Sequence, residues 1–121
     1  MKKILFIEDE AALQKSIGLT LGQEGYEVKA ALNGEEGFKL AKAEHPDLIL
    51  LDLILPRKDG FEVLEELKKD SATQDIPVIV LTNLEGMEHI ERAVELGAQS
   101  YLVKANYSLE EVVRKVKEII K

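Results

Sequence analysis

Residues 48–60 read LILLDLILPRKDG, in which four apolar residues precede an aspartate and a polar turn ends the segment. An unbroken apolar run of this length is typical of a strand that is covered on both faces, as in the middle of a parallel sheet. Two further runs of this kind occupy Ile4–Ile7 and Val78–Leu81. By contrast, Tyr26–Ala30 alternates polar with apolar residues and Tyr101–Val103 is short, so we predict both at the periphery. The sequence thus predicts three central strands and two edge strands.

Segments with helical periodicity lie between these strands and after the last one. The first is predicted over Glu10–Glu24, and the fourth ends at Gly97. The residues predicted to face the core of these two helices are Leu13, Ile17 and Leu21, and Ile90, Ala93 and Val94. The other three helices begin at capping-box patterns, a side-chain acceptor followed three residues later by glutamate, at Asn33–Glu36, Asp59–Glu62 and Ser108–Glu111.

Five β/α units in strict alternation predict an α/β fold: a doubly wound, flavodoxin-like, five-stranded parallel sheet with helices on both faces. Right-handed crossovers leave few topologies, and the strand order 2-1-3-4-5 puts the three apolar strands in the centre. In such a sheet, ligands bind beyond the carboxyl ends of the strands, at the switch point between the first and third strands. The sequence therefore predicts where a site lies before it indicates its chemistry.

Composition excludes several classes of protein. A chain of 121 residues fits one domain over 1–121, and its 45% hydrophobic residues suffice for a core. The absence of cysteine excludes a disulfide scaffold, a thiolate zinc site and a cysteine nucleophile, and is consistent with a cytoplasmic protein. The net charge of −7 argues against nucleic acid or an anionic membrane as a partner. No apolar run approaches the length of a membrane span, and no signal peptide is visible.

Acidic residues follow two of the predicted strands at the switch point. Glu8, Asp9 and Glu10 come after the first strand, and Asp52 comes after the third. Carboxylate oxygens without His or Cys favour Mg²⁺ or Mn²⁺ over zinc, and the mutual repulsion of crowded carboxylates favours the binding of a divalent cation or of a proton. The sequence therefore predicts a Mg²⁺ site with room for water and for a phosphoryl oxygen.

Asp52 is the candidate nucleophile, because an ionised carboxylate can accept a phosphoryl group as an acyl phosphate without a general base. Thr82 ends the fourth strand and Lys104 ends the fifth. Lys104 would supply a point charge to the transferring group, and Thr82 could hydrogen-bond a phosphoryl oxygen. Each of these residue types has a common structural role when taken singly, such as acids near a helix N-terminus. Their joint placement at one edge of the sheet indicates a function.

Together with Leu53–Pro56, Asp59-Gly60 and Tyr101, these residues form a pattern that covers the chain from Lys3 to the last helix. The pattern resembles the response-regulator receiver domain of two-component signalling, of the single-domain chemotaxis-regulator type. The resemblance implies a phosphoacceptor switch and not an enzyme. A sensor histidine kinase or phosphotransfer protein would donate the phosphoryl group to Asp52, and the domain would catalyse only its own phosphorylation and slow dephosphorylation.

The resemblance also implies roles for individual residues. Mg²⁺ would be bound by Asp9, Asp52 and the backbone carbonyl of Ile54, with Glu8 acting through a metal-bound water. Thr82 would be drawn toward the phosphoryl group. The ring of the switch partner, Tyr101, would then swing in behind it and change the surface of the fourth helix, fifth strand and fifth helix. With no DNA-binding segment visible, we expect output through contact with a downstream protein and not through nucleic acid.

Two departures from the family pattern carry expectations of their own. Ala105 stands where the family usually has a cis proline, and a cis bond before a residue other than proline survives only if its surroundings enforce it. The sequence therefore leaves open whether the bond is cis or trans, the shape of the loop from Lys104 to Ser108 and the reach of Lys104. Ile54 and Leu84 are apolar at positions where many members carry polar residues that position the hydrolytic water. We therefore predict slow loss of the phosphoryl group.

Alternatives remain at this point. A pseudo-receiver would use the same fold as a phosphorylation-independent protein-binding module. The chain could also be a fragment of a longer regulator. A flavodoxin-like or phosphatase-like protein is disfavoured, because the glycines contain no Gly-x-Gly-x-x-Gly or P-loop spacing and Ile54 replaces the second acid of an aspartyl phosphatase.

Overall fold

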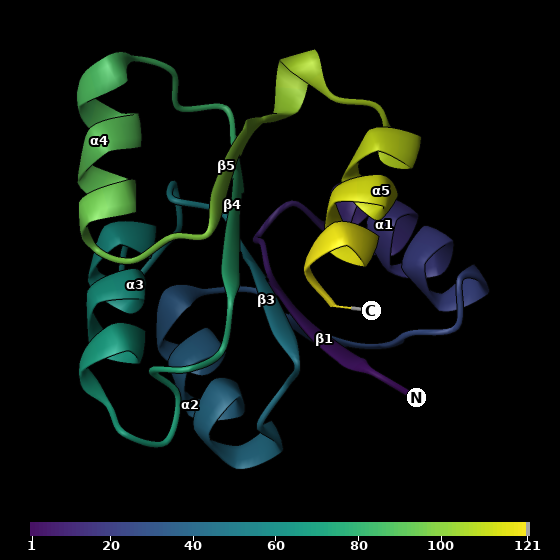
Figure 1. The fold of residues 1–121 in the computed structure, drawn as a ribbon, viewed down its shortest axis with the longest axis horizontal. Coiled ribbons are helices and arrows are strands. Elements are labelled where there is room, and N and C mark those ends of the chain that lie inside the picture. The colour runs from purple at the N-terminus through teal and green to yellow at the C-terminus, as the bar shows by residue number, and fades with distance from the viewer. Residues whose placement is uncertain (121) are drawn as a thin grey trace.

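The structure, a computed structural model, describes residues 1–120 and contains a parallel sheet with strand order β2-β1-β3-β4-β5 (Figure 1). The strands are β1 (Lys3–Ile7), β2 (Glu27–Ala31), β3 (Leu48–Leu51), β4 (Val78–Thr82) and β5 (Ser100–Val103). The helices are α1 (Ala11–Gln23), α2 (Gly34–Glu44), α3 (Gly60–Lys69), α4 (Met87–Glu95) and α5 (Leu109–Ile119), with a short 3₁₀ turn, η1 (Lys104–Asn106). The predicted fold class and strand order are confirmed.

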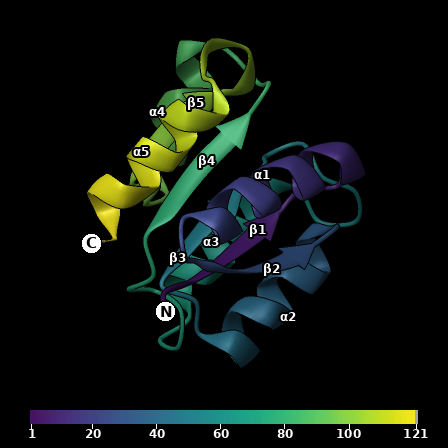
Figure 2. The same ribbon diagram turned by 90° about the vertical axis from the view of Figure 1, so that its right-hand side faces the viewer.

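A layer of helices covers each face of the sheet. Figure 2 shows α1 and α5 in front of the strands, whereas α2, α3 and α4 lie on the other side in Figure 1. Ile17 of α1 and Val116 of α5 belong to the core on the first face, and Ala41, Leu64 and Ala93 belong to the core on the second. Every residue of β3 and β4 is buried, as predicted for strands covered on both faces. No helix within residues 1–120 has the length and apolar character needed to cross a membrane.

The register of the sheet decides which residues meet at its carboxyl edge. Ile7 at the end of β1 pairs with Leu51 at the end of β3, so Glu8 and Asp52 are the next residues on neighbouring strands. The backbone amide of Asp52 donates to the carbonyl of Ile7 at 3.0 Å, which extends the pairing by one residue. Two acids that are far apart in the sequence therefore become neighbours.

Helix ends follow the predicted signals. The side chains of Asn33, Asp59 and Ser108 each accept a hydrogen bond from the backbone amide three residues later. The capping box is complete at Ser108, whose own amide donates to the carboxylate of Glu111 at 3.0 Å. After α1 the chain reverses at Gly25, whose φ of 96° lies in the left-handed region that glycine adopts without strain.

The core faces of α1 and α4 agree only in part with the prediction. In α1, Ile17 and Leu21 are buried as predicted and Leu13 packs partly buried against the core. Gln14 is buried as well, which was not predicted, and its amide donates to the backbone carbonyl of Phe6. In α4, Ala93 is buried as predicted, whereas Ile90 is only partly buried and Val94 is 55% exposed. Leu96, which caps the helix, packs partly buried against the same core as Ala93.

Candidate functional site

A cavity of about 380 Å³, here called the acidic cavity, lies at the carboxyl edge of the sheet. It is lined by Glu8, Asp9, Glu10, Asp52, Ile54, Asn83 and Lys104. The structure thus brings five of the predicted site residues to one place: Glu8, Asp9, Asp52, Ile54 and Lys104. The other two, Thr82 and Tyr101, do not line the cavity.

Asp52 lies at the base of this cavity and is 4% exposed. Its Oδ1 accepts a hydrogen bond from the backbone amide of Ile54 at 3.1 Å, and its Oδ2 accepts one from Nζ of Lys104 at 3.0 Å. Helix α3 begins directly against this segment at Gly60, where a Cβ atom would lie 2.4 Å from the carbonyl oxygen of Asp52. The missing side chain of Gly60 therefore allows α3 to pack beside the candidate nucleophile.

Glu8 is fully buried beside Asp52. Its Oε2 accepts a hydrogen bond from the backbone amide of Glu10 at 3.0 Å. Its Oε1 lies 2.7 Å from Nζ of Lys104 but has no donor with hydrogen-bond geometry among residues 1–120. Burial raises the pKa of Glu8 above its usual range, although Lys104 and the Glu10 amide act in the opposite direction. A second positive charge near Oε1, in addition to that of Lys104, would therefore further stabilise the ionised form of Glu8.

Lys104 connects the two buried carboxylates. Burial by itself lowers the pKa of Lys104, but the hydrogen bonds and charges of Glu8 and Asp52 outweigh burial and raise it, so the group is an ammonium. The bond to Ala105, which the sequence left open, is trans, and the chain continues through η1. The lysine still reaches both carboxylates without a cis bond in this loop.

The donor set of the cavity fits a hard divalent cation. Glu8, Asp9 and Asp52 each offer one carboxylate oxygen, and these three oxygens lie within 4.8 Å of one another. With one ammonium against three carboxylates, two negative charges remain without a partner. Oε1 of Glu8 is buried and has no hydrogen-bond donor with good geometry among residues 1–120, although it forms an ion pair with Lys104. An all-oxygen set with this charge suits Mg²⁺ or Mn²⁺ and offers no soft ligand for zinc.

Thr82 and Tyr101 meet at the backbone of one residue, Leu84, and not at the cavity. Thr82 is fully buried, and its Oγ1 accepts a hydrogen bond from the backbone amide of Leu84 at 3.3 Å. The hydroxyl of Tyr101 donates to the carbonyl of the same Leu84 at 2.6 Å, and the ring packs partly buried against the core. Sequence reasoning assigned Leu84 to the control of hydrolysis and missed that it links these two side chains.

Gln14 is a second residue that sequence reasoning missed. Its buried amide donates to carbonyl oxygens at the ends of β1 and β2, among them that of Glu8 at 3.1 Å. The signal was a polar residue at helical spacing from Ile17 and Leu21, on the apolar face of α1.

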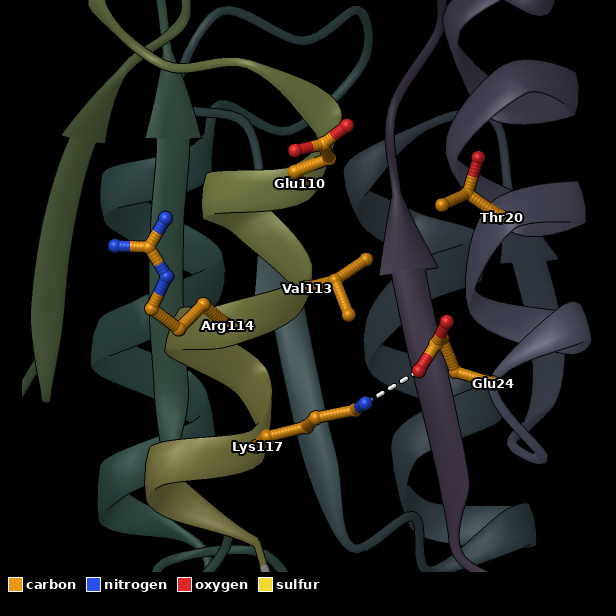
Figure 3. Close-up of a pocket in the computed structure, with 6 residues that line it drawn as sticks. All are labelled: Thr20, Glu24, Glu110, Val113, Arg114 and Lys117. Atoms are coloured by element: carbon orange, nitrogen blue, oxygen red, sulfur yellow. Dashed lines mark ion pairs between the residues drawn. The ribbon is translucent and has the colours of Figure 1, made fainter.

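A second cavity, of about 290 Å³, lies between α1 and α5 and contains none of the predicted site residues (Figure 3). Its lining consists of Thr20, Glu24, Glu110, Val113, Arg114 and Lys117. Glu24 and Lys117 form an ion pair across it, whereas Arg114 points away from the other charged groups (Figure 3). The cluster of three carboxylates found among residues 1–120 lies in the acidic cavity and not between α1 and α5, so the acidic cavity is the candidate site for metal binding and phosphoryl transfer.

Comparison with known proteins agrees with the geometry of the acidic cavity. Residues 4–117 match the family model described as the response regulator receiver domain. The DNA-binding dual master transcriptional regulator RpaA of Synechocystis sp. is 38% identical over 121 residues, which are 100% of this chain and 50% of that protein. The chemotaxis protein CheY4 of Vibrio cholerae has a similar structure, with a TM-score of 0.92, 27% identity and 99% of each chain covered. The Mn²⁺-bound form of the response regulator Rcp1 gives a TM-score of 0.83 at 32% identity and covers 98% of this chain and 91% of that one.

These relatives correct one prediction. The chain spans about half the length of the curated relatives it matches, and RpaA is by name a DNA-binding regulator. The prediction that nucleic acid plays no part is therefore wrong. The net charge of −7 describes the receiver region, and it carries no information about DNA contacts that a regulator makes through other parts of its chain. The match over residues 4–117, the sheet topology and the acidic cavity agree, and the chain belongs to the response regulator receiver domain family of two-component signalling.

Proposed function

We propose that residues 1–121 form one receiver domain that accepts a phosphoryl group on Asp52 from the phosphohistidine of a sensor kinase or phosphotransfer protein. The observation that carries this proposal is the position of Asp52 at the base of the acidic cavity, bonded to Lys104 and beside Glu8 and Asp9. A carboxylate oxygen of Asp52 attacks phosphorus. A P–O bond forms as the P–N bond breaks, and the electron pair of that bond stays on the imidazole nitrogen.

The residues around Asp52 support this transfer in different ways. The Lys104 ammonium holds Oδ2 of Asp52 and attracts phosphoryl oxygens that enter the cavity. The amide of Ile54 fixes Oδ1, which orients the carboxylate. Asp52 needs no general base, because a carboxylate oxygen attacks without having to lose a proton.

The metal site is proposed on the same residues. Asp9, Asp52 and the backbone carbonyl of Ile54 would hold Mg²⁺, with Glu8 acting through water, as the donor set and its two uncompensated charges suggest. A divalent cation is also what the Mn²⁺-bound relative carries. When bound, Mg²⁺ would neutralise charge on the phosphoryl oxygens.

Phosphorylation by a small phosphodonor tests the proposal directly. The chain, incubated with phosphoramidate and MgCl₂, is expected to gain the mass of one phosphoryl group, and Asp52→Asn is expected to gain none. Asp47→Asn is a matched control, because Asp47 precedes β3 and Asp52 follows it, so Asp47 lies at the other end of the strand, away from the cavity. A chain that gains no mass would support the phosphorylation-independent module instead, and equal labelling of Asp52→Asn would place the phosphoryl group elsewhere.

The two backbone contacts at Leu84 suggest how the signal leaves the site. The Thr82 hydroxyl accepts from the Leu84 amide, which leaves its own proton free to donate toward a phosphoryl oxygen. A turn of Thr82 toward the phosphoryl group would weaken the contact with Leu84 and disturb the Tyr101 hydrogen bond to the same residue. The amide resonance of Leu84 is expected to shift on phosphorylation. An unchanged resonance would contradict this route.

We further propose that a longer regulator containing this domain controls transcription, as the name of the matched relative suggests. Phosphorylation of Asp52 is expected to change the affinity of that regulator for its DNA. Equal affinities of the phosphorylated and unphosphorylated forms, measured at one salt concentration, would refute this output.

A further inference from the structure

We infer that Gln14 is a positioning residue for the acidic half of the metal site. The inference rests on the proposed metal site, and it concerns a side chain that does not line the cavity. Gln14 is 8% exposed and lies in the first full turn of α1, where its backbone amide donates to the carbonyl of Glu10. Its side chain turns back from the helix toward the ends of β1 and β2.

The side-chain amide of Gln14 holds three backbone carbonyls together. Nε2 lies 2.8 Å from the carbonyl oxygen of Phe6, 3.0 Å from that of Ala31 and 3.1 Å from that of Glu8. An amide group has two hydrogens, so the three bonds share them. The carbonyl of Ala31 also accepts from the backbone amide of Glu8 at 2.9 Å. One side chain thus ties the last residues of two strands to the turn that carries the acids.

This turn is where the metal ligands leave the sheet. The peptide that joins Glu8 to Asp9 begins at the carbonyl that Gln14 holds, so its orientation sets the direction of both carboxylates. The Glu8 side chain is fixed separately, by the Glu10 amide and by Lys104. Without the Gln14 amide, the Glu8 carbonyl would lose its donor and would turn toward water, because an unpaired buried carbonyl is costly.

Mg²⁺ tolerates such a change poorly, because it requires near-ideal octahedral geometry. Replacing a residue that orients metal ligands typically weakens metal affinity by about 10- to 100-fold. We therefore expect Gln14→Met, which keeps the size of the side chain and removes its donor, to weaken Mg²⁺ binding by about 10-fold.

The experiment separates positioning from general stability. MgCl₂ is titrated calorimetrically into the chain and its variants, each shown to be folded by circular dichroism. Thr73→Val is the matched control, because Thr73 is fully buried and its hydroxyl donates to the carbonyl of Leu67 at 2.7 Å, at the opposite edge of the sheet. Both substitutions remove a buried donor from a backbone carbonyl, but only Gln14→Met is expected to weaken Mg²⁺ binding. Gln14→Asn keeps an amide of shorter reach and replaces Gln14→Met if that variant does not fold. The Mg²⁺ affinity of Gln14→Asn is expected to lie between the affinities of the unmodified chain and of Gln14→Met.

Each outcome decides a different statement. If the unmodified chain binds no Mg²⁺, the proposed metal site fails, and the role of Gln14 fails with it. If the chain binds Mg²⁺ and the Gln14 variants bind it equally well, the metal site stands and Gln14 is a structural residue. Equal weakening by Thr73→Val would show that affinity follows stability and would also overturn the inference.

Discussion

Replacing Lys104 with methionine tests the electrostatics of the acidic cavity. In the native chain, Nζ lies 2.7 Å from Oε1 of Glu8 and 3.0 Å from Oδ2 of Asp52, and the lysine side chain is 15% exposed. Methionine keeps most of the apolar stem and removes the charge. Removal of one partner from a buried ion pair typically costs 3–5 kcal/mol. Because the cavity is open to solvent on one side, we expect a loss near the lower limit, about 3 kcal/mol of unfolding free energy.

Urea unfolding followed by circular dichroism measures this loss, since the chain has no tryptophan. With an m-value of about 1.5 kcal/mol/M, the midpoint should fall by about 2 M urea. The control is Lys69→Met, because Lys69 pairs with Glu65 at 3.3 Å on the exposed face of α3, where an ion pair contributes little. Its midpoint should remain close to that of the unmodified chain.

The same titration in MgCl₂ gives a second reading. Without the ammonium, the cavity holds one more uncompensated negative charge, so a bound cation should restore part of the lost stability. We expect MgCl₂ to stabilise Lys104→Met more than the unmodified chain, and Lys69→Met to the same extent as the unmodified chain. Two results would refute the reasoning: a Lys104→Met midpoint equal to that of Lys69→Met without Mg²⁺, or an equal effect of Mg²⁺ on all three proteins.

Three further outcomes are expected. Gly18→Ala should raise the unfolding free energy by about 0.5–1 kcal/mol, because Gly18 lies within α1 and the added Cβ would contact Val28 at an ordinary 3.9 Å. Gly60→Ala should lower the unfolding free energy by about 1–3 kcal/mol, because its Cβ would overlap the backbone of Asp52. Urea midpoints of both variants equal to that of the unmodified chain would contradict both predictions. Hydrogen bonds from Ser108 hold the pKa of Glu111 below its usual range, so the stability that Glu111 contributes is present above the usual pKa of a glutamate and is lost as the pH falls through the lower pKa of the folded state. In acid titrations followed by circular dichroism, Glu111→Gln should lack this part of the fall in stability. Phosphorylated Asp52 should persist for minutes or longer in MgCl₂, because the exposed Ile54 that lines the cavity has no polar group to hold the hydrolytic water. Ile54→Asn should shorten this lifetime. Intact-mass time courses that show loss of the phosphoryl group within seconds in the unmodified chain would contradict the prediction.

Much of the fold and part of the site could be predicted from local pattern. Unbroken apolar runs identified β1, β3 and β4, and acceptor residues at Asn33, Asp59 and Ser108 identified helix starts, because these features depend on residues a few positions apart. The residues at the ends of strands followed from topology, since parallel strands bring their carboxyl ends to one edge. The exposure of Val94 did not follow, because it depends on how α4 rests on the sheet.

Sequence alone determined the alternation of strands and helices, the all-oxygen chemistry of the site and the residues that supply it, because periodicity and residue type are local properties. Tertiary structure decided how those residues connect. Lys104 bridges two carboxylates across a loop with a trans bond, Thr82 and Tyr101 meet at Leu84, and the amide of Gln14 gathers carbonyls from two strands. Each of these contacts depends on ångström-scale distances between segments far apart in the chain, which register and packing set and which no local pattern encodes.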